Sequence, residues 1–402
     1  MKKTKICRSC GSGELMLFLS LGRLPLASVL GADQLMAAEE RRSLEVGFCK
    51  RCSLVQLLSE PAPEPPTQAP PSEESLQEQF LDHHLLMPQR VLALEGSNLA
   101  LMQSLVQAGV GVVYLEPHPE RSKMASKKGI PTRQVPFGRH YAQILREEGF
   151  GADLVLANQL LSYSNDLNGL LEGLGSVLLD TGRVVMELPY VREWLEARQF
   201  EHFTHQQAHY FSVGALHQLA RRHGWWLQRV EPLSGGFLRY YLGKARPVEP
   251  SVGWYMEEEQ ALGLSDATYY LEFASRVAAV REALLALLTE LRARGQRLAA
   301  YGANVQGTAL LNYVGLGREV IEFVVDSDTG KQGRFLAGVH VPIYGLQKLL
   351  EEQPNYLLLL GPPSKTAREY QEYLQRGGKL IVPLPHPDIL SPDPKRNIQL
   401  DT

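Results

Sequence analysis

From residue 90 onward, short apolar runs alternate with stretches in which apolar residues recur every three or four positions. The apolar runs are typical of buried strands and cover residues 90–94, 110–115, 153–158 and 183–188. The amphipathic stretches predict helices over residues 98–108, 166–177 and 213–223, with Asp166 and Ser212 placed to cap the second and third. Two further apolar segments flank Ser234-Gly235-Gly236, which indicates an antiparallel hairpin. The pattern predicts an α/β domain with a Rossmann-like sheet and an added reversed strand.

A second α/β unit follows a long predicted helix over residues 271–294, which Gly295 ends. Apolar runs predict the strands of a small parallel sheet at residues 298–302, 320–326, 356–361 and 379–385, with a helix through residues 310–313. The predicted fold class is therefore α/β, with two Rossmann-like domains after a small N-terminal lobe.

A proline-rich segment precedes the first α/β domain. Residues 59–75 read SEPAPEPPTQAPPSEES, a composition that favours an extended linker over a helix or a central strand. We divide the chain into an N-terminal lobe at 1–58, a linker at 59–77, the first α/β domain at 78–246, and a helix with the second α/β domain at 247–402.

The composition is that of an ordinary soluble globular protein, with 44% apolar and 21% charged residues. The net charge of -3 argues against nucleic acid as a partner, because phosphate binding needs clustered positive charge. No apolar run approaches the roughly 18 residues that a membrane span requires. Residues 15–22 imitate a signal sequence, but Glu14 precedes the run and Arg23 ends it, so we expect a cytoplasmic protein.

All four cysteines fall in two CxxC pairs, Cys7/Cys10 and Cys49/Cys52. Two such turns bring four thiolates to one tetrahedral ion, so the spacing predicts a closed, structural Zn²⁺ site. The alternatives are two disulfides or a redox pair, which a cytoplasmic chain without other cysteines disfavours.

The strand ends carry candidate ligand-binding residues. A nucleotide cofactor at this edge of the sheet needs glycines after the first strand and an acid after the second. Glu116 supplies the acid, although it could also be a strand-end residue that faces water. The segment after the first strand has Gly96 alone, followed by Leu99 and Ala100. In the second unit, residues 302–307 resemble a phosphate-binding turn, or they serve only tight packing of strand and helix.

Residues 200–212, FEHFTHQQAHYFS, contain His202, His205 and His209. At helical spacing these histidines would share one face and could hold a metal ion. Because the next helix starts after Ser212, the stretch is predicted to be loop or strand, where the spacing does not bring the histidines together.

Several separated motifs resemble one family, the S-adenosylmethionine (SAM)-dependent C-methyltransferases that act on nucleotide-linked deoxysugars in antibiotic biosynthesis. They are CRSCG and FCKRCSLVQL in the lobe, ADLVLANQLLSYSNDL, MELPYV and SGGFLRYY in the middle, and AAYGANVQGTALLNYVGL and FVVDSDTGKQGRFLAGVHVPIY near the end. The resemblance covers nearly the whole chain. It implies a zinc-binding domain, a class I methyltransferase domain that binds SAM, and a C-terminal domain that helps to hold a nucleotide-linked sugar. The implied reaction is proton removal beside a keto group, followed by attack of the enolate on the methyl group of SAM.

The reaction positions depart from the family pattern more than the scaffold does. The family loop Tyr-His-Glu-His corresponds to Thr204, His205, Gln206 and Gln207 here, so glutamine stands where the resemblance places the general base. The family's histidine after the fourth strand is Tyr163, and the lysine of its C-terminal glycine turn is Gln306.

Two hypotheses follow. In the first, the chain is an active methyltransferase in which His205 or His209 is the base and Tyr210 or Tyr163 stabilises the enolate. By resemblance, the cofactor would contact Gly96, Glu116 and Asn158, and the sugar nucleotide would contact Glu187, Arg239, Tyr301, Gly302 and Lys331. In the second, it is a non-catalytic binding or scaffolding subunit that pairs with an intact methyltransferase or another biosynthetic enzyme. A zinc-dependent oxidoreductase is disfavoured, because four cysteines leave no open coordination position.

Overall fold

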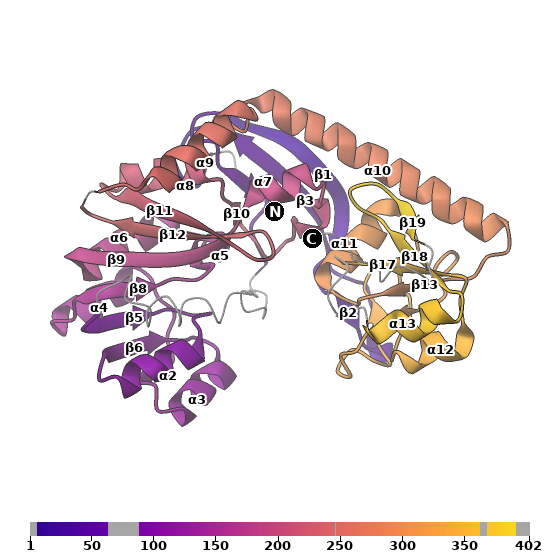
Figure 1. Cartoon of the computed structure of the whole chain (residues 1–402), viewed down its shortest axis with the longest axis horizontal. Helices are drawn as coiled ribbons and strands as arrows, with labels where there is room; N and C mark the ends of the chain where they lie inside the picture. The colour runs from indigo at the N-terminus through magenta and orange to yellow at the C-terminus, as the bar shows by residue number, and fades with distance from the viewer. Residues whose placement is uncertain (1–5, 63–87, 246, 362–367, 391–402) are drawn as a thin grey trace. The chain divides into compact units, whose positions relative to one another are not determined.

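The computed structural model describes residues 6–62, 88–245, 247–361 and 368–390 (Figure 1). The chain forms two compact units, each assembled from separate stretches of sequence. Unit 1 is drawn from Met1–Leu17, Gly47–Glu193 and Gln206–Tyr269, and unit 2 from Phe18–Val46, Trp194–His205 and Tyr270–Thr402. The predicted linker lies outside the described residues from residue 63 onward.

Unit 1 contains a seven-stranded sheet in the order β11-β12-β9-β8-β5-β6-β7. Its strands are β5 (Arg90–Ala93), β6 (Gly111–Leu115), β7 (Thr132–Arg133), β8 (Ala152–Leu156), β9 (Leu178–Pro189), β11 (Trp226–Leu233) and β12 (Phe237–Gly243). Strand β12 runs antiparallel to both neighbours, and the pairs from β7 to β9 are parallel. The predicted Rossmann-like sheet with a closing hairpin is confirmed.

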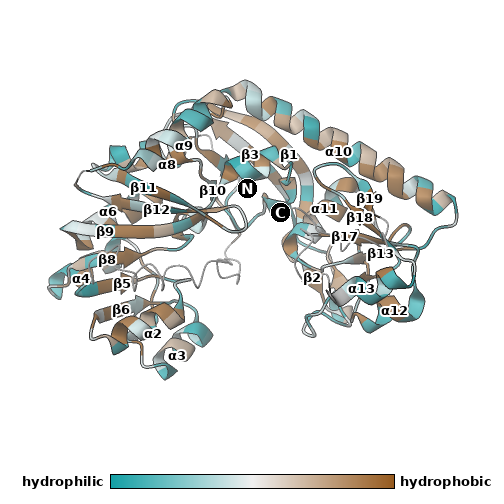
Figure 2. Ribbon diagram, in the orientation of Figure 1, coloured by the Kyte–Doolittle hydropathy of each residue, from teal (hydrophilic) through white to brown (hydrophobic). Residues whose placement is uncertain are grey.

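Helices cover both faces of this sheet, because its central strands are apolar on both sides. Val91 and Ala93 of β5 pack with residues of α2, whereas Leu92 packs with residues of α6 on the opposite face. Figure 2 shows the strands β5 and β8 as predominantly hydrophobic. The helices are α2 (Leu99–Gln107), α3 (Pro119–Lys127), α4 (Arg139–Glu147), α5 (Leu160–Tyr163), α6 (Leu167–Val177), α8 (Val213–Arg222) and α9 (Pro250–Ala261).

The two predicted helix caps are present. The side chain of Asp166 accepts a hydrogen bond from the backbone N–H of Gly169 at 2.8 Å, and that of Ser212 accepts one from Ala215 at 3.1 Å. Each cap satisfies an amide that has no partner within its own helix, so the starts of α6 and α8 follow from local sequence.

Unit 2 contains a six-stranded sheet in the order β16-β14-β13-β17-β18-β19, parallel except for the antiparallel edge strand β19. Its strands are β13 (Leu298–Tyr301), β14 (Val324–Val325), β16 (Ile343–Tyr344), β17 (Tyr356–Leu359), β18 (Lys379–Val382) and β19 (Asp388–Leu390). Helices α11 (Val305–Val314), α12 (Gln347–Glu352) and α13 (Arg368–Gln375) belong to this unit, and the long helix α10 (Ala267–Ala293) leads into it.

Two predicted elements have different lengths in the structure. The strand expected over residues 320–326 is reduced to β14. Val320 and Ile321 are buried, as an apolar run predicts, but they are not part of a strand. The helix expected from residue 271 begins four residues earlier, at Ala267.

The N-terminal lobe contributes strands to a four-stranded sheet in the order β1-β3-β4-β10. These strands are β1 (Leu15–Pro25), β3 (Arg41–Cys49), β4 (Val55–Leu57) and β10 (His209–Tyr210). Within unit 2, β2 (Val29–Leu30) pairs with β15 (Phe335–Leu336), close in sequence to the short helix η1 (Ala32–Gln34). The histidine stretch contains the short helix η2 (Phe200–His202) after α7 (Val191–Glu196) and is otherwise loop and strand, as predicted.

Candidate functional site

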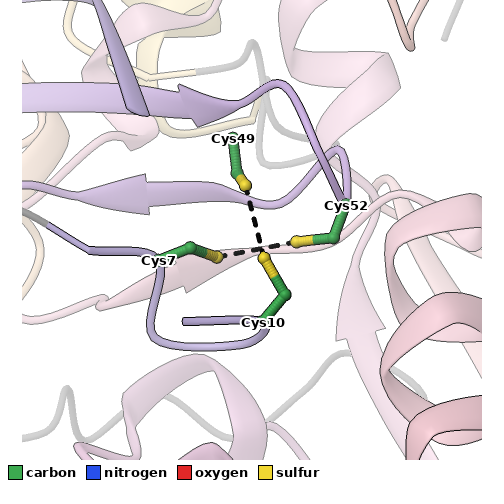
Figure 3. Close-up of side chains that lie close together, drawn as sticks. All are labelled: Cys7, Cys10, Cys49 and Cys52. Atoms are coloured by element: carbon green, nitrogen blue, oxygen red, sulfur yellow. Dashed lines mark hydrogen bonds between the residues drawn. The ribbon is translucent and has the colours of Figure 1, made fainter. Parts of the chain in front are cut away.

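The four cysteines converge at one point in unit 1 (Figure 3). Their sulfur atoms all lie within 4.8 Å of one another, with Cys7 Sγ 3.5 Å from Cys52 Sγ and Cys10 Sγ 3.6 Å from Cys49 Sγ. None of the four forms a disulfide. Each pair lies on a tight turn that closes on its first cysteine, whose carbonyl accepts from Gly11 in one turn and from Ser53 in the other. The alternative of two disulfides therefore does not hold in this structure.

This arrangement fits a zinc ion. Tetrahedral coordination with Zn–S bonds of about 2.3 Å places the sulfurs about 3.8 Å apart, close to the separations found here. The Cys52 thiol hydrogen-bonds to Cys7 and lowers the pKa of Cys7 to about 5, which favours a thiolate there. Four thiolates would complete the coordination shell, so the ion would be structural and leave no position for a substrate.

The cysteine lobe is joined to the loop that resembles the family's catalytic segment. Strand β4 pairs antiparallel with β10, so that Gln56 lies opposite His209 and Val55 lies opposite Tyr210. Arg8, inside the first cysteine turn, donates to the carbonyls of Leu57 and Ser59. The cysteine turns therefore fix the position of residues 209–210, a connection that the sequence does not predict.

The candidate cofactor edge of unit 1 begins with the turn after β5. Gly96 has a φ of +81°, a conformation that favours glycine, and a Cβ there would lie 3.7 Å from the carbonyl oxygen of Asn158. The side chain of Asn98 caps α2 by accepting from the amides of Ala100 and Leu101. The turn thus brings Gly96 beside Asn158, while Asn98 already occupies two of the first amides of the helix.

Glu116, which ends β6, is fully buried, so the alternative that it faces water is wrong. One carboxylate oxygen accepts from the Tyr114 hydroxyl at 2.6 Å and from Arg121 Nε at 3.0 Å. The other accepts from the backbone N–H of His118 at 3.0 Å. Burial and the nearby charge of Glu116 raise the pKa of Glu95. Both carboxylate oxygens of Glu116, the residue predicted to bind ribose, are therefore already hydrogen-bonded within the protein.

Asn158 precedes the short helix α5 after β8, and Tyr163 is the last residue of that helix. The amide oxygen of Asn158 is buried and has no hydrogen-bond partner among the described residues. The Tyr163 hydroxyl donates to the side chain of Gln159 at 3.2 Å, and burial raises the pKa of Tyr163. Asn158 thus has a side-chain acceptor without a partner among the described residues, and its backbone carbonyl lies near Gly96.

The two candidate bases, His205 and His209, lie in different compact units and are both buried. Burial lowers the pKa of His205 to about 4, assisted by Arg42, and that of His209 to about 3, assisted by Arg8. His209 Nδ1 lies 3.0 Å from the carbonyl oxygen of Leu161, as expected for a donated hydrogen bond. Both imidazoles are therefore neutral but very weakly basic, whereas efficient general bases have pKa values near the working pH.

Other residues of this loop are also buried, whereas His202, Thr204 and Gln206 are partly exposed. Tyr210 is 1% exposed in β10, and Gln207 Nε2 donates to the carbonyl of His209 at 3.0 Å. Gln207 thus uses its amide to shape the loop at the position that resembles the family's base.

The two predicted sugar contacts of unit 1, Glu187 and Arg239, form a buried ion pair across β9 and β12. Arg239 donates from Nε and one terminal nitrogen to Glu187 Oε1, at 3.0 and 2.7 Å. A third nitrogen lies 3.5 Å from Glu231. The structure brings these two residues together, and their predicted role in sugar binding stays a prediction.

In unit 2, the turn after β13 is fixed by Asp326, the last residue of the strand predicted over residues 320–326. The Asp326 carboxylate accepts from the Ala303 amide at 2.7 Å and from Lys331 Nζ at 3.3 Å. Tyr301 and Gly302, the latter with a φ of +100°, are half-buried beside it. The predicted contacts Tyr301, Gly302 and Lys331 are therefore grouped at one edge of the sheet.

These features define a class of protein. The seven-stranded sheet, with its reversed strand β12 inserted beside β9, is the arrangement of class I methyltransferases, and here it carries a four-cysteine lobe. Comparison with known proteins agrees. Residues 232–385 match the family model "C-methyltransferase C-terminal domain", and residues 7–65 match the model "Putative zinc binding domain". The chain is 30% identical to the C-methyltransferase NovU of Streptomyces niveus over 406 residues, which covers 96% of both chains.

The chain belongs to the C-methyltransferase family. Solved structures with some likeness include the glycopeptide N-methyltransferase MtfA complexed with SAM, which is 12% identical, with 46% of this chain and 100% of that chain covered and a TM-score of 0.34. Another is the DhpI–SAH complex, 18% identical, with coverages of 44% and 87% and a TM-score of 0.32. Among the helices that the structure describes, none has the length and apolar character to cross a membrane.

Proposed function

We propose that this protein is a non-catalytic member of the C-methyltransferase family that binds a nucleotide-linked sugar without methylating it. The observation that carries the proposal is Gln207. An amide cannot accept the substrate proton, and this one donates to the carbonyl of His209. The neighbouring imidazoles of His205 and His209 do not replace the missing base, because their pKa values lie at about 4 and about 3.

The cofactor edge supports the same conclusion. A ribose would need acceptor positions on Glu116, and that carboxylate is fully buried, with both oxygens bound to Tyr114, Arg121 and the His118 amide. Weak or absent SAM binding follows. The protein would then act as a binding or scaffolding subunit of a biosynthetic pathway, beside an intact methyltransferase or another enzyme.

The experiment combines calorimetric titration with SAM and S-adenosylhomocysteine and a methyl-transfer assay on 4-keto nucleotide sugars. We expect binding of the nucleotide sugar, no micromolar binding of SAM, and no transfer of labelled methyl. Co-purification with biosynthetic enzymes encoded by neighbouring genes then tests the scaffolding role.

An active enzyme is the second candidate, favoured by Asn158, whose amide oxygen has no partner among the described residues and whose backbone lies near Gly96. Methyl transfer that falls after His205→Ala or His209→Ala, and not after substitution of the exposed control His140→Ala, would establish this alternative in place of our proposal.

A further inference from the structure

A cavity of about 70 Å³ lies in unit 2 at the carboxyl ends of β17 and β18. Its walls include Leu310 of α11, Leu360 after β17, and Val382 and Leu384 at the end of β18, and the short helix η2 and the residue before it contribute Gln199 and Glu201. Since one water needs on the order of 10–15 Å³, the space accepts a group of several heavy atoms.

This cavity lies beside the usual ligand position of the sheet, which is between β13 and β17, and it shares the end of β17 with that position. From β13 the chain continues to β14 on one side, whereas β17 pairs with β13 on the other. Such a reversal of strand order opens a crevice at the carboxyl ends of the strands, where open α/β sheets bind their ligands.

Glu201 supplies an unsatisfied polar group to the otherwise largely apolar wall. It is 4% exposed, and its Oε2 atom has no hydrogen-bond partner among the described residues. His202 Nε2 lies 3.9 Å from the other oxygen, Oε1. None of the other described residues that line the cavity is titratable.

A buried carboxyl group without a cation stays protonated, because desolvation disfavours its charged form. Burial raises the pKa of Glu201 to about 8. An uncharged carboxyl group offers one donor and one acceptor side by side.

The walls around Glu201 are held by specific contacts. Arg198 hydrogen-bonds to His386 and to the carbonyl of Pro385, which joins the segment before η2 to the segment after β18. The Phe200 ring lies 5.0 Å from that of Tyr313 on α11. At Gly307, a Cβ would come within 2.6 Å of Leu360, so α11 packs directly on the strand end.

Phosphate does not fit this cavity. The side chain of Asn304 already accepts from the amide of Gly307 at 2.6 Å, and no cationic residue is among the described lining residues. Gly307 thus serves close packing, and the site favours an uncharged ligand group.

We propose that this cavity binds the hydrogen-bonding edge of a nucleobase, with the Glu201 carboxyl group pairing with an adjacent donor and acceptor on the ring. The proposal rests on the proposed function, since the base would be that of the nucleotide-linked sugar. The apolar walls contributed by Leu310, Leu360 and Val382 contact the faces and edges of the ring. Glu201 is the specificity-determining residue of this subsite.

Calorimetric titration of the full chain with uridine, cytidine, adenosine and guanosine at about pH 6.5 tests the subsite without SAM or sugar. We expect at least one nucleoside to bind. Glu201→Ala should weaken it by roughly 10-fold or more, because a buried polar ligand edge loses its partner. Glu201→Gln keeps a donor and an acceptor and should retain the affinity within a few-fold. The control Glu196→Gln, on the exposed side of α7, should leave it unchanged.

The pH dependence gives a second readout. Affinity of the wild type should fall above about pH 8, as Glu201 ionises, and that of Glu201→Gln should not. Leu310→Phe, which narrows the cavity without touching the carboxyl group, should also weaken binding, and circular dichroism verifies that each variant is folded.

Absence of nucleoside binding at millimolar concentration, or binding that Glu201→Ala and Leu310→Phe both leave intact, overturns the subsite. Failure of the proposed function looks different. It would appear as methyl transfer by the wild type, or as nucleosides that bind through Glu201 while the nucleotide sugar does not bind.

Discussion

Arg239→Met removes the cation from the buried ion pair between β12 and β9. Arg239 and Glu187 are 0% and 1% exposed, so the variant leaves a carboxylate inside the sheet without its cation. Removing one partner of a buried pair costs about 3–5 kcal/mol. Glu231 does not offset the loss, because it is itself a carboxylate and cannot replace the missing cation. It already binds Tyr241 and Arg229. We therefore expect a loss near 4 kcal/mol.

The matched control is the double variant Arg239→Met with Glu187→Leu. It removes both charges and fills the space with apolar side chains, an exchange that is often neutral or stabilising in other proteins. We expect it to recover most of the stability that the single variant loses.

Hydrogen exchange measured by mass spectrometry on the peptides of β9 and β12 is the suitable assay. A chain with two compact units need not unfold in one step, so local opening is more informative than a single melting temperature. A loss near 4 kcal/mol corresponds to roughly 1,000-fold faster exchange.

Two results would refute this reasoning. One is a change of less than tenfold in the single variant, and the other is a double variant as damaged as the single one. If Arg239→Met instead leaves protection intact and abolishes binding of the nucleotide sugar, the pair belongs to ligand recognition.

Three further predictions concern the metal, the buried histidines and a helix start. The protein should contain about one zinc ion per chain by elemental analysis. The variant Cys52→Ser should lose the zinc, whereas Lys50→Ala, at an exposed position, should keep it. A wild-type protein that is folded and metal-free would contradict the site. By NMR, the imidazoles of His205 and His209 should stay neutral between pH 5 and 8. Their pKa values in the folded protein lie below the unfolded value of about 6.5. Their contribution to the free energy of unfolding should therefore be complete above that pH and decline as the pH falls toward 4. His209→Gln should reduce this acid sensitivity, and an unchanged profile would count against it. Glu259 accepts from the amides of Val213 and Gly214 at 2.6 and 2.8 Å, so Glu259→Ala should cost about 1–2 kcal/mol at the start of α8, measured by exchange of its first amides, whereas Glu259→Gln should cost less. Equal protection in both variants would exclude a capping role.

The elements with local signals were predictable from the sequence. The turn at Ser234-Gly235-Gly236 joins β11 and β12 in register, with Leu233 opposite Phe237. Asp166 and Ser212 cap the predicted helices, because a cap depends on residues only three positions apart. The cysteine cluster was predictable for a similar reason, since CxxC spacing carries its own geometry.

Long-range pairing was not predictable in this way. Strand β4 joins β10 from a distant part of the chain, and no residue of either strand specifies that partner. Residues 15–22 resemble an isolated apolar run but form most of β1, because another strand pairs with them.

The candidate site divides along the same line. Glu116 was expected from its position at a strand end, but its hydrogen bonds with Tyr114 and Arg121 depend on the folded sheet and the following helix. Glu201 has no motif around it, and it becomes notable only because packing buries it at a cavity. An acid placed between Phe200 and Phe203 was the available signal.

Strand β2 cannot pair until β15 has been synthesised. Leu30 pairs with Phe335, which is made about 300 residues later. At roughly 5–20 residues per second, β2 waits on the order of 15–60 s with an unpaired edge. Expression of residues 1–58 alone, or truncation before Phe335, should therefore leave that edge open to other chains and favour aggregation. Unit 2 can therefore be completed only after Phe335 has been made, because β2 and β15 come from parts of the chain about 300 residues apart.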